Sequence, residues 1–360
     1  MKAFLAGFLV LAAAPGLHAA GASPGAPPAQ VYAWIKGQQQ ATGVVRNQEG
    51  DPFSGLYVDG VAALCYLHQG DVARAEKIFD FFDTYRQKSW GADKAHRGFP
   101  GAINADTGVV DEKSDRWIGD NSWLLLALNY HRALTGSKKY AALHGAMEDW
   151  LISLQDPDGG IESGFNKSGP MTFKSTEGNL DTYAALVDRP EARQKIYTWL
   201  TENMYVESAG RFRTGTTVQD TALDCCSWAV AALGPSFGRC LTYAETHYIQ
   251  SAPMDARPGF MAKGFGDLPG KKRVWFEGTG EMIVAYRAAG RPADAEKWIA
   301  QMAAQSVQGQ NGIGWPCSST DGPWTGSTTR LFVPSNTWYL FGSWKFNPMN
   351  SSSWKHSAQK

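Results

Sequence analysis

The segment GDNSWLLLALNYHRALTG (119–136), followed by SKKYAALHGAMEDWLISLQ (137–155), contains the pattern from which the fold can be inferred. Apolar residues recur at helical spacing in both parts, and Gly136 with a short polar turn separates them. The first part is apolar on nearly all sides, whereas the second carries charged residues on one face. A helix that is apolar all round is buried, and an amphipathic helix covers it and meets water. The segment therefore predicts a helical hairpin with a buried inner helix and a solvent-facing outer helix.

Four further hairpins follow the same pattern at intervals of roughly 50–60 residues, which is typical of a repeat architecture. Their inner helices are expected at 55–70, 177–187, 220–234 and 274–290. In each case an amphipathic segment with Lys, Arg and Glu on one face follows the inner helix. Each joint is a glycine or a short polar turn.

A sixth pair can form between the two ends of the chain. Residues 335–344 have the inner pattern but no following partner, and residues 29–40 form an unpaired helix. Their pairing would close a ring of inner helices inside a ring of outer helices. We therefore predict an all-α fold, an (α/α)6 toroid of helical hairpins. An open helical solenoid has the same local pattern and is the alternative.

The N-terminal residues 1–22 have the features of a secretory signal peptide: a positive charge, a short apolar core and a small-residue cleavage site. Residues 23–30 have the composition of a linker, 31–346 are expected to form a single toroid domain, and 347–360 a C-terminal tail. The apolar run is too short to span a bilayer. We expect an exported protein, periplasmic or extracellular, without stable membrane insertion.

Charge and cysteine content exclude several classes of partner. The chain has 34 basic and 34 acidic residues, which argues against a nucleic-acid-binding surface. Five cysteines are too many by one to pair fully within the chain, and their spacing fits no zinc motif. The histidines do not cluster in the sequence. We therefore expect no metal and no cofactor.

Long segments rich in Gly, Pro, Asp and aromatic residues separate the hairpins, at 89–118, 156–174, 207–219, 251–272 and 309–334. Each joins the end of an outer helix to the start of the next inner helix, so all of them should lie on one face of the ring. Loops of this length are usually functional or disordered, and the tryptophans in them argue against disorder. We expect these loops to form the walls of a groove.

Acidic residues lie at the start of several of the expected inner helices. Glu177 and Glu277 are each followed by glycine at the start of an apolar run, and Asp59, Asp120 and Asp224 have comparable positions. Carboxylates at helix N-termini often serve only to cap free N–H groups and to offset the helix dipole, at about 0.3–1 kcal/mol each. If the inner helices form a ring, however, several carboxylates share one cleft, which is suited to acid/base chemistry.

The hairpin pattern resembles the (α/α)6 toroid, or six-hairpin, glycosidases. The strongest local match, WIGDNSWLLLALNYHRALTGSKKY (117–140), is similar to a segment of bacterial and fungal endo-α-1,6-mannanases in which two adjacent aspartates carry the chemistry. Here Gly119 replaces the first of them and Asp120 matches the second. The resemblance implies a secreted carbohydrate-active enzyme, a glycoside hydrolase that cleaves a poly- or oligosaccharide.

Glycoside hydrolysis uses two carboxyl groups, one that protonates the leaving oxygen and one that activates water or attacks the sugar. Glu177 and Glu277 are each doubled one helical turn later, by Asp181 and Glu281, and two like charges on one helical face raise one pKa. We predict Glu277 as the general acid and Glu177 or Asp120 as the base. Supporting roles are expected for five residues: Asp181, Asp224, Glu281, Asp59 and Asn179.

Aromatic residues in loops or at the edges of the motifs are candidates for stacking on sugar rings. They are Trp275, Trp117, Trp90, Trp315, Trp324 and Tyr183. Trp123, Trp228 and Trp338 follow the inner-helix motifs at similar positions and are expected in the core instead.

Two other functions fit the same pattern. A polysaccharide lyase on the same fold would need a Tyr or His base and an Asn or Arg near the uronate carboxylate, for which Tyr183, Asn179 and Arg116 are available. A non-catalytic protein that binds glycans, or that takes part in export, is the other alternative.

Overall fold

The computed structural model describes residues 25–320 and 327–356, and within these ranges the chain is rich in helix. Buried and solvent-facing helices alternate along the chain, as the hairpin pattern predicts. The inner helices are α2 (Leu56–His68), α4 (Ile118–Thr135), α6 (Thr176–Ala185), α8 (Asp224–Leu233), α10 (Phe276–Ala288) and α12 (Val333–Ser343). The outer helices are α1 (Pro28–Gln38), α3 (Val72–Ser89), α5 (Ala141–Ser153), α7 (Pro190–Trp199), α9 (Arg239–His247) and α11 (Pro292–Ala304).

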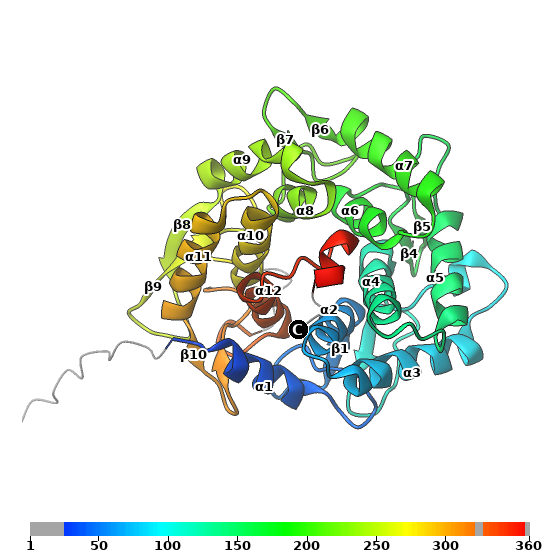
Figure 1. Cartoon of the computed structure of the whole chain (residues 1–360), viewed down its shortest axis with the longest axis horizontal. Coiled ribbons are helices and arrows are strands. Elements are labelled where there is room, and N and C mark those ends of the chain that lie inside the picture. Colours follow the sequence, from blue (N-terminus) through cyan, green and yellow to red (C-terminus); the bar gives the residue numbers. More distant parts are fainter. Residues whose placement is uncertain (1–24, 321–326, 357–360) are drawn as a thin grey trace, which may run out of the picture.

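The inner helices contact one another in a closed circuit. Each packs on the next, from α2 through α4, α6, α8 and α10 to α12, and α12 packs back on α2 (Figure 1). The N-terminal α1 packs on α12, as the expected sixth pair requires. This circuit, with the outer helices around it, is consistent with an α/α toroid and does not fit an open solenoid.

Burial separates the two sets of helices. All residues from Phe276 to Tyr286 of α10 are buried, whereas α11 buries Ala295, Trp298 and Met302. Small residues let the inner helices approach closely. A Cβ on Gly60 would lie 2.8 Å from the backbone of Trp123, and a Cβ on Gly280 would lie 2.7 Å from Trp338. These contacts are too short for any side chain, so glycine is required at both positions.

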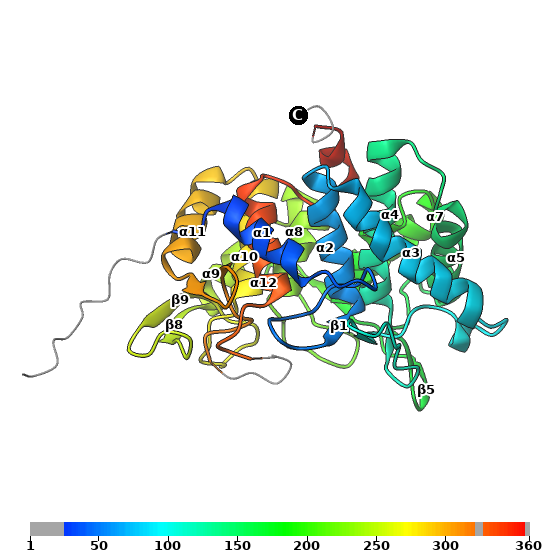
Figure 2. The same ribbon diagram turned by 90° about the horizontal axis from the view of Figure 1, so that it is seen from below.

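Short antiparallel strands occupy the segments between the hairpins, so the expectation of an all-α chain is wrong there. The pairs are β1 (Phe53–Gly55) with β2 (Ala102–Asn104), β6 (Tyr205–Val206) with β7 (Arg211–Phe212), β8 (Ile249–Pro253) with β9 (Met261–Phe265), and β10 (Val307–Gln308) with β11 (Ile313–Gly314). A three-stranded sheet contains β3 (Arg116–Trp117), β4 (Gly164–Asn166) and β5 (Gly169–Met171). The strands labelled in Figure 2 lie together below the helices, on the face where the inner helices begin.

A repeated hydrogen-bond device attaches these segments to the ring. The fourth residue of α4, Asn121, accepts a bond from the backbone N–H of Phe99 (2.8 Å) and donates to its carbonyl (3.1 Å) and to that of Trp117 (2.8 Å). Asn179, the fourth residue of α6, makes the same three bonds with Ile161 and Ser175. Asn336 repeats them at the start of α12 with Trp315 and Phe332.

The C-terminal segment covers the opposite end of the ring. The short 3-10 helix Ser351–His356 lies over the inner helices in Figure 1 and above them in Figure 2. Met349 and Trp354 are buried, Trp354 contacts Tyr130 of α4, and Asn347 donates to the carbonyl of Ala231 (2.9 Å). Most of the expected C-terminal tail is therefore packed against the ring and closes it from this side.

At the N-terminal side, α1 begins at Pro28, inside the stretch expected as a linker, and Ala26 is already buried. The expected signal peptide lies outside the described residues. In the described part of the chain, no helix combines the length and the apolar character needed to cross a bilayer. All five cysteines are buried as free thiols.

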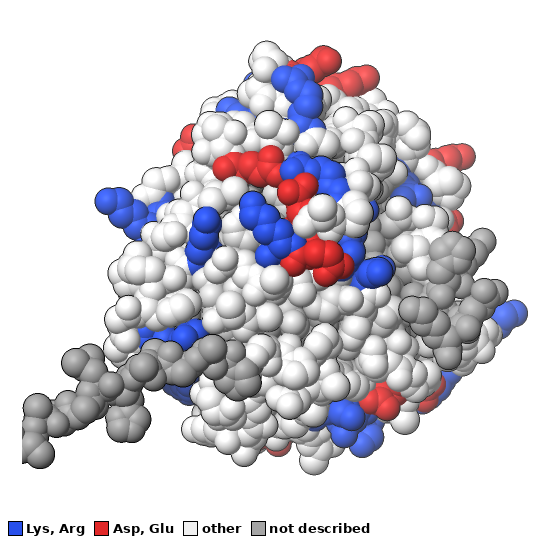
Figure 3. Space-filling model, turned by 60° about the vertical axis from the view of Figure 1, so that its left-hand side comes forward, with Lys and Arg blue, Asp and Glu red and all other residues white. Residues whose placement is uncertain are grey.

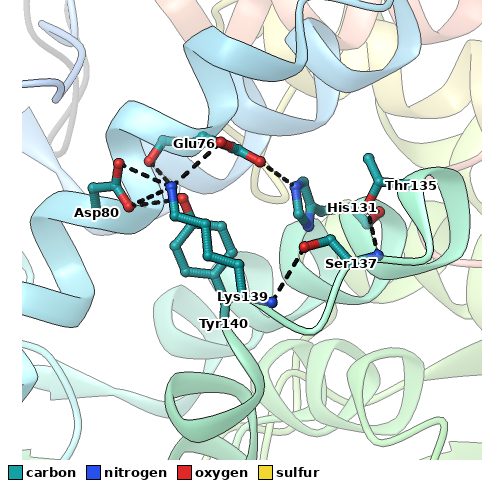
Figure 4. Close-up of polar contacts among 7 residues, drawn as sticks. All are labelled: Glu76, Asp80, His131, Thr135, Ser137, Lys139 and Tyr140. Atoms are coloured by element: carbon teal, nitrogen blue, oxygen red, sulfur yellow. Dashed lines mark hydrogen bonds and ion pairs between the residues drawn. The ribbon is translucent and has the colours of Figure 1, made fainter.

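Polar clusters join neighbouring hairpins on the outside (Figure 4). Lys139, just before α5, lies between Glu76 (3.3 Å) and Asp80 (2.9 Å) of α3, and Tyr140 donates to Asp80 (2.8 Å). His131 of α4 contacts the other oxygen of Glu76 at 3.0 Å. The first two hairpins are thus linked by paired charges at their solvent-facing edge.

The asparagine device gives a prediction about stability. Replacing Asn179 by alanine leaves the buried N–H and carbonyl of Ile161 without partners, and each unpaired buried group costs about 1–3 kcal/mol. We expect Asn179→Ala to lower the free energy of unfolding by about 2–4 kcal/mol, measured by denaturant titration. Asn166→Ala, which removes one exposed turn bond, is the matched control and should cost under about 1 kcal/mol. Equal losses in the two variants would contradict this role for the device.

Candidate active site

The second residues of the inner helices converge on a cavity at the face where these helices begin. This position holds Tyr57 in α2, Gly119 in α4, Glu177 in α6 and Glu277 in α10, and Asp224 at the start of α8 takes the corresponding place. All five residues line one cavity of about 410 Å³. Because the helix N-termini point toward it, their dipoles stabilise negative charge there.

A second level of side chains lies one helical turn deeper. Four residues later the same helices carry Trp123, Asp181, Trp228 and Glu281, which also line the cavity. Trp338 of α12 packs beneath them, with its ring centre 5.5 Å from that of Trp123 and 5.9 Å from that of Trp228. These tryptophans are buried, as expected for core residues, but two of them form the aromatic floor of the cavity.

Tyr57 orients one of the carboxylates. Its hydroxyl accepts a hydrogen bond from the indole N–H of Trp338 (2.7 Å) and donates to Oε1 of Glu277 (2.7 Å). Because the Tyr57 oxygen accepts from Trp338, its own proton is directed to Glu277. The sequence interpretation missed Tyr57 because it searched the inner-helix motifs for acids. Its position, second in an inner helix, was the available signal.

A neighbouring cavity of about 380 Å³ continues from the central one. Trp117, Phe173, Ser175 and the backbone at 178 line it, and it shares Gly119, Asp120 and Glu177 with the central cavity. Trp117 meets Phe173 edge to face at 5.9 Å between ring centres, and Phe173 is partly exposed. Asp120 and Glu177 therefore lie at the junction of a deep compartment and an outer compartment with aromatic walls.

The absence of a side chain at Gly119 makes room for an acid from the next helix. A Cβ added to Gly119 would lie 2.8 Å from Oδ2 of Asp181. The aspartate that the mannanase segment has at this position is thus missing, and the Asp181 carboxylate of α6 is located beside the gap. Asp120 of α4 and Asp181 of α6 line the same cavity.

Burial and mutual repulsion raise the pKa values of these acids. Desolvation raises the pKa of Asp120 to about 7, with Asp115 adding to the shift, and raises the pKa of Glu277 to about 7 against the opposing effect of the Tyr57 bond. The pKa of Asp224 rises to about 6, mainly by desolvation, while hydrogen bonds from Cys225 lower it. Three carboxyl groups of the cavity therefore have pKa values close to neutral pH.

The other three carboxyl groups are shifted further. Desolvation first, and then the charge of Glu177, raises the pKa of Asp181 well above its usual range; desolvation and Glu277 do the same for Glu281. The pKa of Glu177 is also raised well above its usual range by desolvation and by Asp224. Because the Glu177 side chain remains exposed to solvent in the cavity, we assign more of its shift to the neighbouring carboxylates than to burial.

Several buried polar atoms of residues that line the cavity have no hydrogen-bond partner. They are Oδ1 of Asp181, Oε1 of Glu281 and the indole nitrogens of Trp228 and Trp275, all buried. Such atoms normally have partners in folded proteins. The cavity therefore offers both donors and acceptors to a polar ligand.

Several predicted site residues lie elsewhere. Asp59 is fully buried outside the cavity lining, where it accepts hydrogen bonds from the N–H of Val45 (2.8 Å) and the hydroxyl of Ser54 (2.9 Å). It is the fourth residue of α2, so it corresponds to Asn121 and not to Asp120. Asn179 has the same attachment role in α6. Both are structural residues, which corrects the expected supporting roles.

Three of the predicted aromatic contacts are also wrong. Trp90 packs against Phe99, and Trp315 is fully buried with its N–H donating to the carbonyl of Met302 (2.8 Å). Tyr183 packs against Tyr197 with the two rings tilted by 41°, and the guanidinium of Arg193 lies over its ring, away from the cavity lining. Trp275 and Trp117 do line the two cavities, and Trp324 lies outside the described residues.

One group with metal-ligand spacing occurs outside the cavity, among the residues that the structure describes: His144, Glu148 and Asp188. The sequence did not predict it because Asp188 lies 40 residues after Glu148 in the chain. Arg189 already pairs with Glu148 (3.0 Å) and Arg132 with Asp188 (2.5 Å). Since two guanidinium groups occupy the carboxylates, we assign no metal to this group.

The close contact between Gly119 and Asp181 is testable. In Gly119→Ala, the new Cβ must displace the Asp181 carboxylate, and such overpacking costs about 1–3 kcal/mol. We expect a lower free energy of unfolding and, in a crystal structure, a rotated Asp181 side chain.

Gly145→Ala is the matched control, because a Cβ on this helical glycine meets nothing within 4 Å. This variant should be stabilised by about 0.5–1 kcal/mol through helix propensity. Gly119→Ala behaving like Gly145→Ala would show that the site tolerates a side chain there.

Solved structures of similar fold act on carbohydrates. The chain is similar to a glycosidase (12% identity, 88–89% of this chain and 95–96% of that chain, TM-score 0.62), to an α-amylase from Clostridium perfringens (10%, 89% and 97%, 0.62) and to cellobiose 2-epimerase from Spirochaeta thermophila (12%, 89% and 94%, 0.61). No family model and no curated protein matches the sequence. At such identities the likeness concerns the fold, which glycosidases and sugar epimerases share; a relation to endo-mannanases is not shown.

Proposed function

We propose that the protein is a glycoside hydrolase that cleaves a poly- or oligosaccharide in the cleft formed by the two adjoining cavities. The observation that supports this most is the position of Asp120 and Glu177, which line both cavities. A sugar chain that extends from the outer compartment into the deep one would have a glycosidic bond next to them. We further propose that the N-terminal leader exports the protein to the periplasm or the extracellular space.

The hydrogen bonds favour a definite division of roles. Glu277 accepts from Tyr57, which favours its ionised form, whereas Glu177 receives no hydrogen bond from the residues that the structure describes. We therefore assign Glu177 as the general acid and Glu277 as the ionised partner, the reverse of the sequence-based assignment. Asp120 and Asp224 line the same cavity, and their charges contribute to the raised pKa of Glu177.

A lyase reaction is less well supported. Its uronate substrate needs a neighbouring cation, and no Lys, Arg or His lines either of the two cavities. Arg116 pairs with Glu112 (3.0 Å), Asn179 binds backbone, and Tyr183 is on the outer side. The three residues that the lyase alternative required are thus engaged elsewhere.

The assignment predicts distinct defects for two variants. Glu177→Gln and Glu277→Gln should each lower turnover of a natural oligosaccharide by about 10²–10⁴-fold. With an activated aryl glycoside, whose leaving group needs no proton, Glu177→Gln should recover most of its rate and Glu277→Gln should not. Product release would be followed as new reducing ends. Glu296→Gln, an exposed glutamate paired with Arg287, is the control and should keep full activity.

The pH profile checks the same assignment. Glu277 must be ionised, so kcat/KM should fall as the pH drops below about 7, the pKa of this carboxyl group. Glu177 must be protonated, so the alkaline limb should lie at higher pH and should disappear in Glu177→Gln assayed with the activated substrate. If Glu277→Gln, and not Glu177→Gln, recovered its rate with the activated aryl glycoside, the roles of general acid and ionised partner would be reversed. An epimerised sugar with no new reducing end would refute hydrolysis.

A further inference from the structure

Acidic clusters outside the cavity are paired with basic side chains. Lys139 lies between Glu76 and Asp80 (Figure 4), and Lys174 contacts Asp156 and Asp158 at 2.7 Å each. On the face drawn in Figure 3, acidic and basic side chains likewise lie next to one another. The fold thus compensates clustered carboxylates with nearby cations.

The carboxyl groups of the central cavity, in contrast, have almost no cations next to them. Six of its carboxyl groups make no ion pair with any described residue: Asp120, Glu177, Asp181, Asp224, Glu277 and Glu281. The seventh, Asp267, is paired with Arg273 (Nε to Oδ1, 2.9 Å). No Lys, Arg or His is among the side chains that line the cavity. Three of the six, Asp181, Glu277 and Glu281, are buried, and uncompensated buried carboxyl groups are costly unless something pairs with them.

Two of these lining residues have a buried carboxyl oxygen without a hydrogen-bond partner. Oδ1 of Asp181 and Oε1 of Glu281 make no hydrogen bond, and each residue is only 1% exposed. They come from α6 and α10, at the same helical level as Trp123 and Trp228. Buried acceptors next to aromatic rings form a suitable environment for an organic cation.

We propose that the cavity is specific for a sugar that carries a free, protonated amine, so that the substrate is a glycan containing amino sugars. The inference rests on the proposed function and extends it to a substrate class. An ammonium group has three N–H donors and no acceptor, which suits the unpartnered oxygens of Asp181 and Glu281. Its charge supplies the counter-ion that the cavity lacks, and the faces of Trp123 and Trp228 add cation–π attraction.

Other occupants fit less well. A metal ion needs at least three ligand atoms close together, and within the described ranges the group with that spacing is His144, Glu148 and Asp188, outside the cavity. A uronate would add another carboxylate to the cluster and would be repelled. An acetylated amine has one N–H and no charge, so it would leave the carboxylates uncompensated.

The test compares three ligands that share ring and linkage and differ in one substituent: oligosaccharides of glucosamine, of N-acetylglucosamine and of glucose. Binding to the full-length wild-type protein would be measured by calorimetry, and a galactosamine series would extend the set. We expect the amine ligand to bind at least about tenfold more tightly than its acetylated and hydroxyl counterparts. Equal or weaker binding of the amines, or no binding of any amine, overturns the proposal.

Two variants test whether Asp181 and Glu281 bind the amine. Asp181→Asn and Glu281→Gln should each reduce the preference for the amine at least about tenfold and leave the affinity for the neutral ligand nearly unchanged. Asp80→Asn, which removes a surface charge from the cluster in Figure 4, should keep the wild-type preference. An unchanged preference in both cavity variants overturns the assignment. If they do not fold, the wild-type comparison still decides the proposal.

The outcomes separate this inference from the proposed hydrolysis. Cleavage of neutral oligosaccharides without preference for amines would retain the hydrolase and refute the amine specificity. Tight, selective binding of amines without any cleavage would do the reverse.

Discussion

The structure depends on the crowding of carboxyl groups at the beginning of the inner helices. Glu177, Asp224 and Glu277 occupy equivalent positions around one cavity, and Asp181 and Glu281 lie one turn below. Desolvation and the neighbouring like charges raise the pKa of Glu177, Asp181 and Glu281 well above the usual range. The same repulsion provides protonated and ionised carboxyl groups side by side, which is the requirement for acid/base catalysis.

The arrangement of the inner helices in a ring offsets part of the repulsion between these carboxyl groups. The inner helices α2, α4, α6, α8 and α10 place residues of their first turns at the cavity, so their dipoles offset part of the repulsion. Tyr57 stabilises the ionised form of Glu277, and the buried asparagines hold the connecting segments at fixed positions. The C-terminal segment closes the opposite end of the ring, where Trp354 packs on Tyr130. The cavity lies at the opposite end of the inner helices, where they begin.

Sequence reasoning found the helical hairpins because apolar periodicity is a strong local signal, and it placed Glu177 and Glu277 correctly at helix starts. It misjudged the register of Asp59, which corresponds to Asn121, because the segments between hairpins differ in length and the spacing gives no absolute frame. It missed Tyr57, whose role depends on a contact with a residue more than two hundred positions away. The strands are two to five residues long, too short for a periodic pattern, and the loop residues Trp90 and Trp315 fill space under loops that pack closely.

The central claim is that a sugar chain lies across the junction at Asp120 and Glu177. It is tested most directly by a crystal structure of the Glu177→Gln variant with a bound oligosaccharide. We expect one sugar ring over Trp123 and Trp228 and another near Trp117. The glycosidic oxygen that connects them should lie within about 2.6–3.2 Å of the side chain of residue 177. A ligand bound elsewhere, for example in the surface depression between Thr42 and Lys88, with the carboxylates untouched, would contradict it.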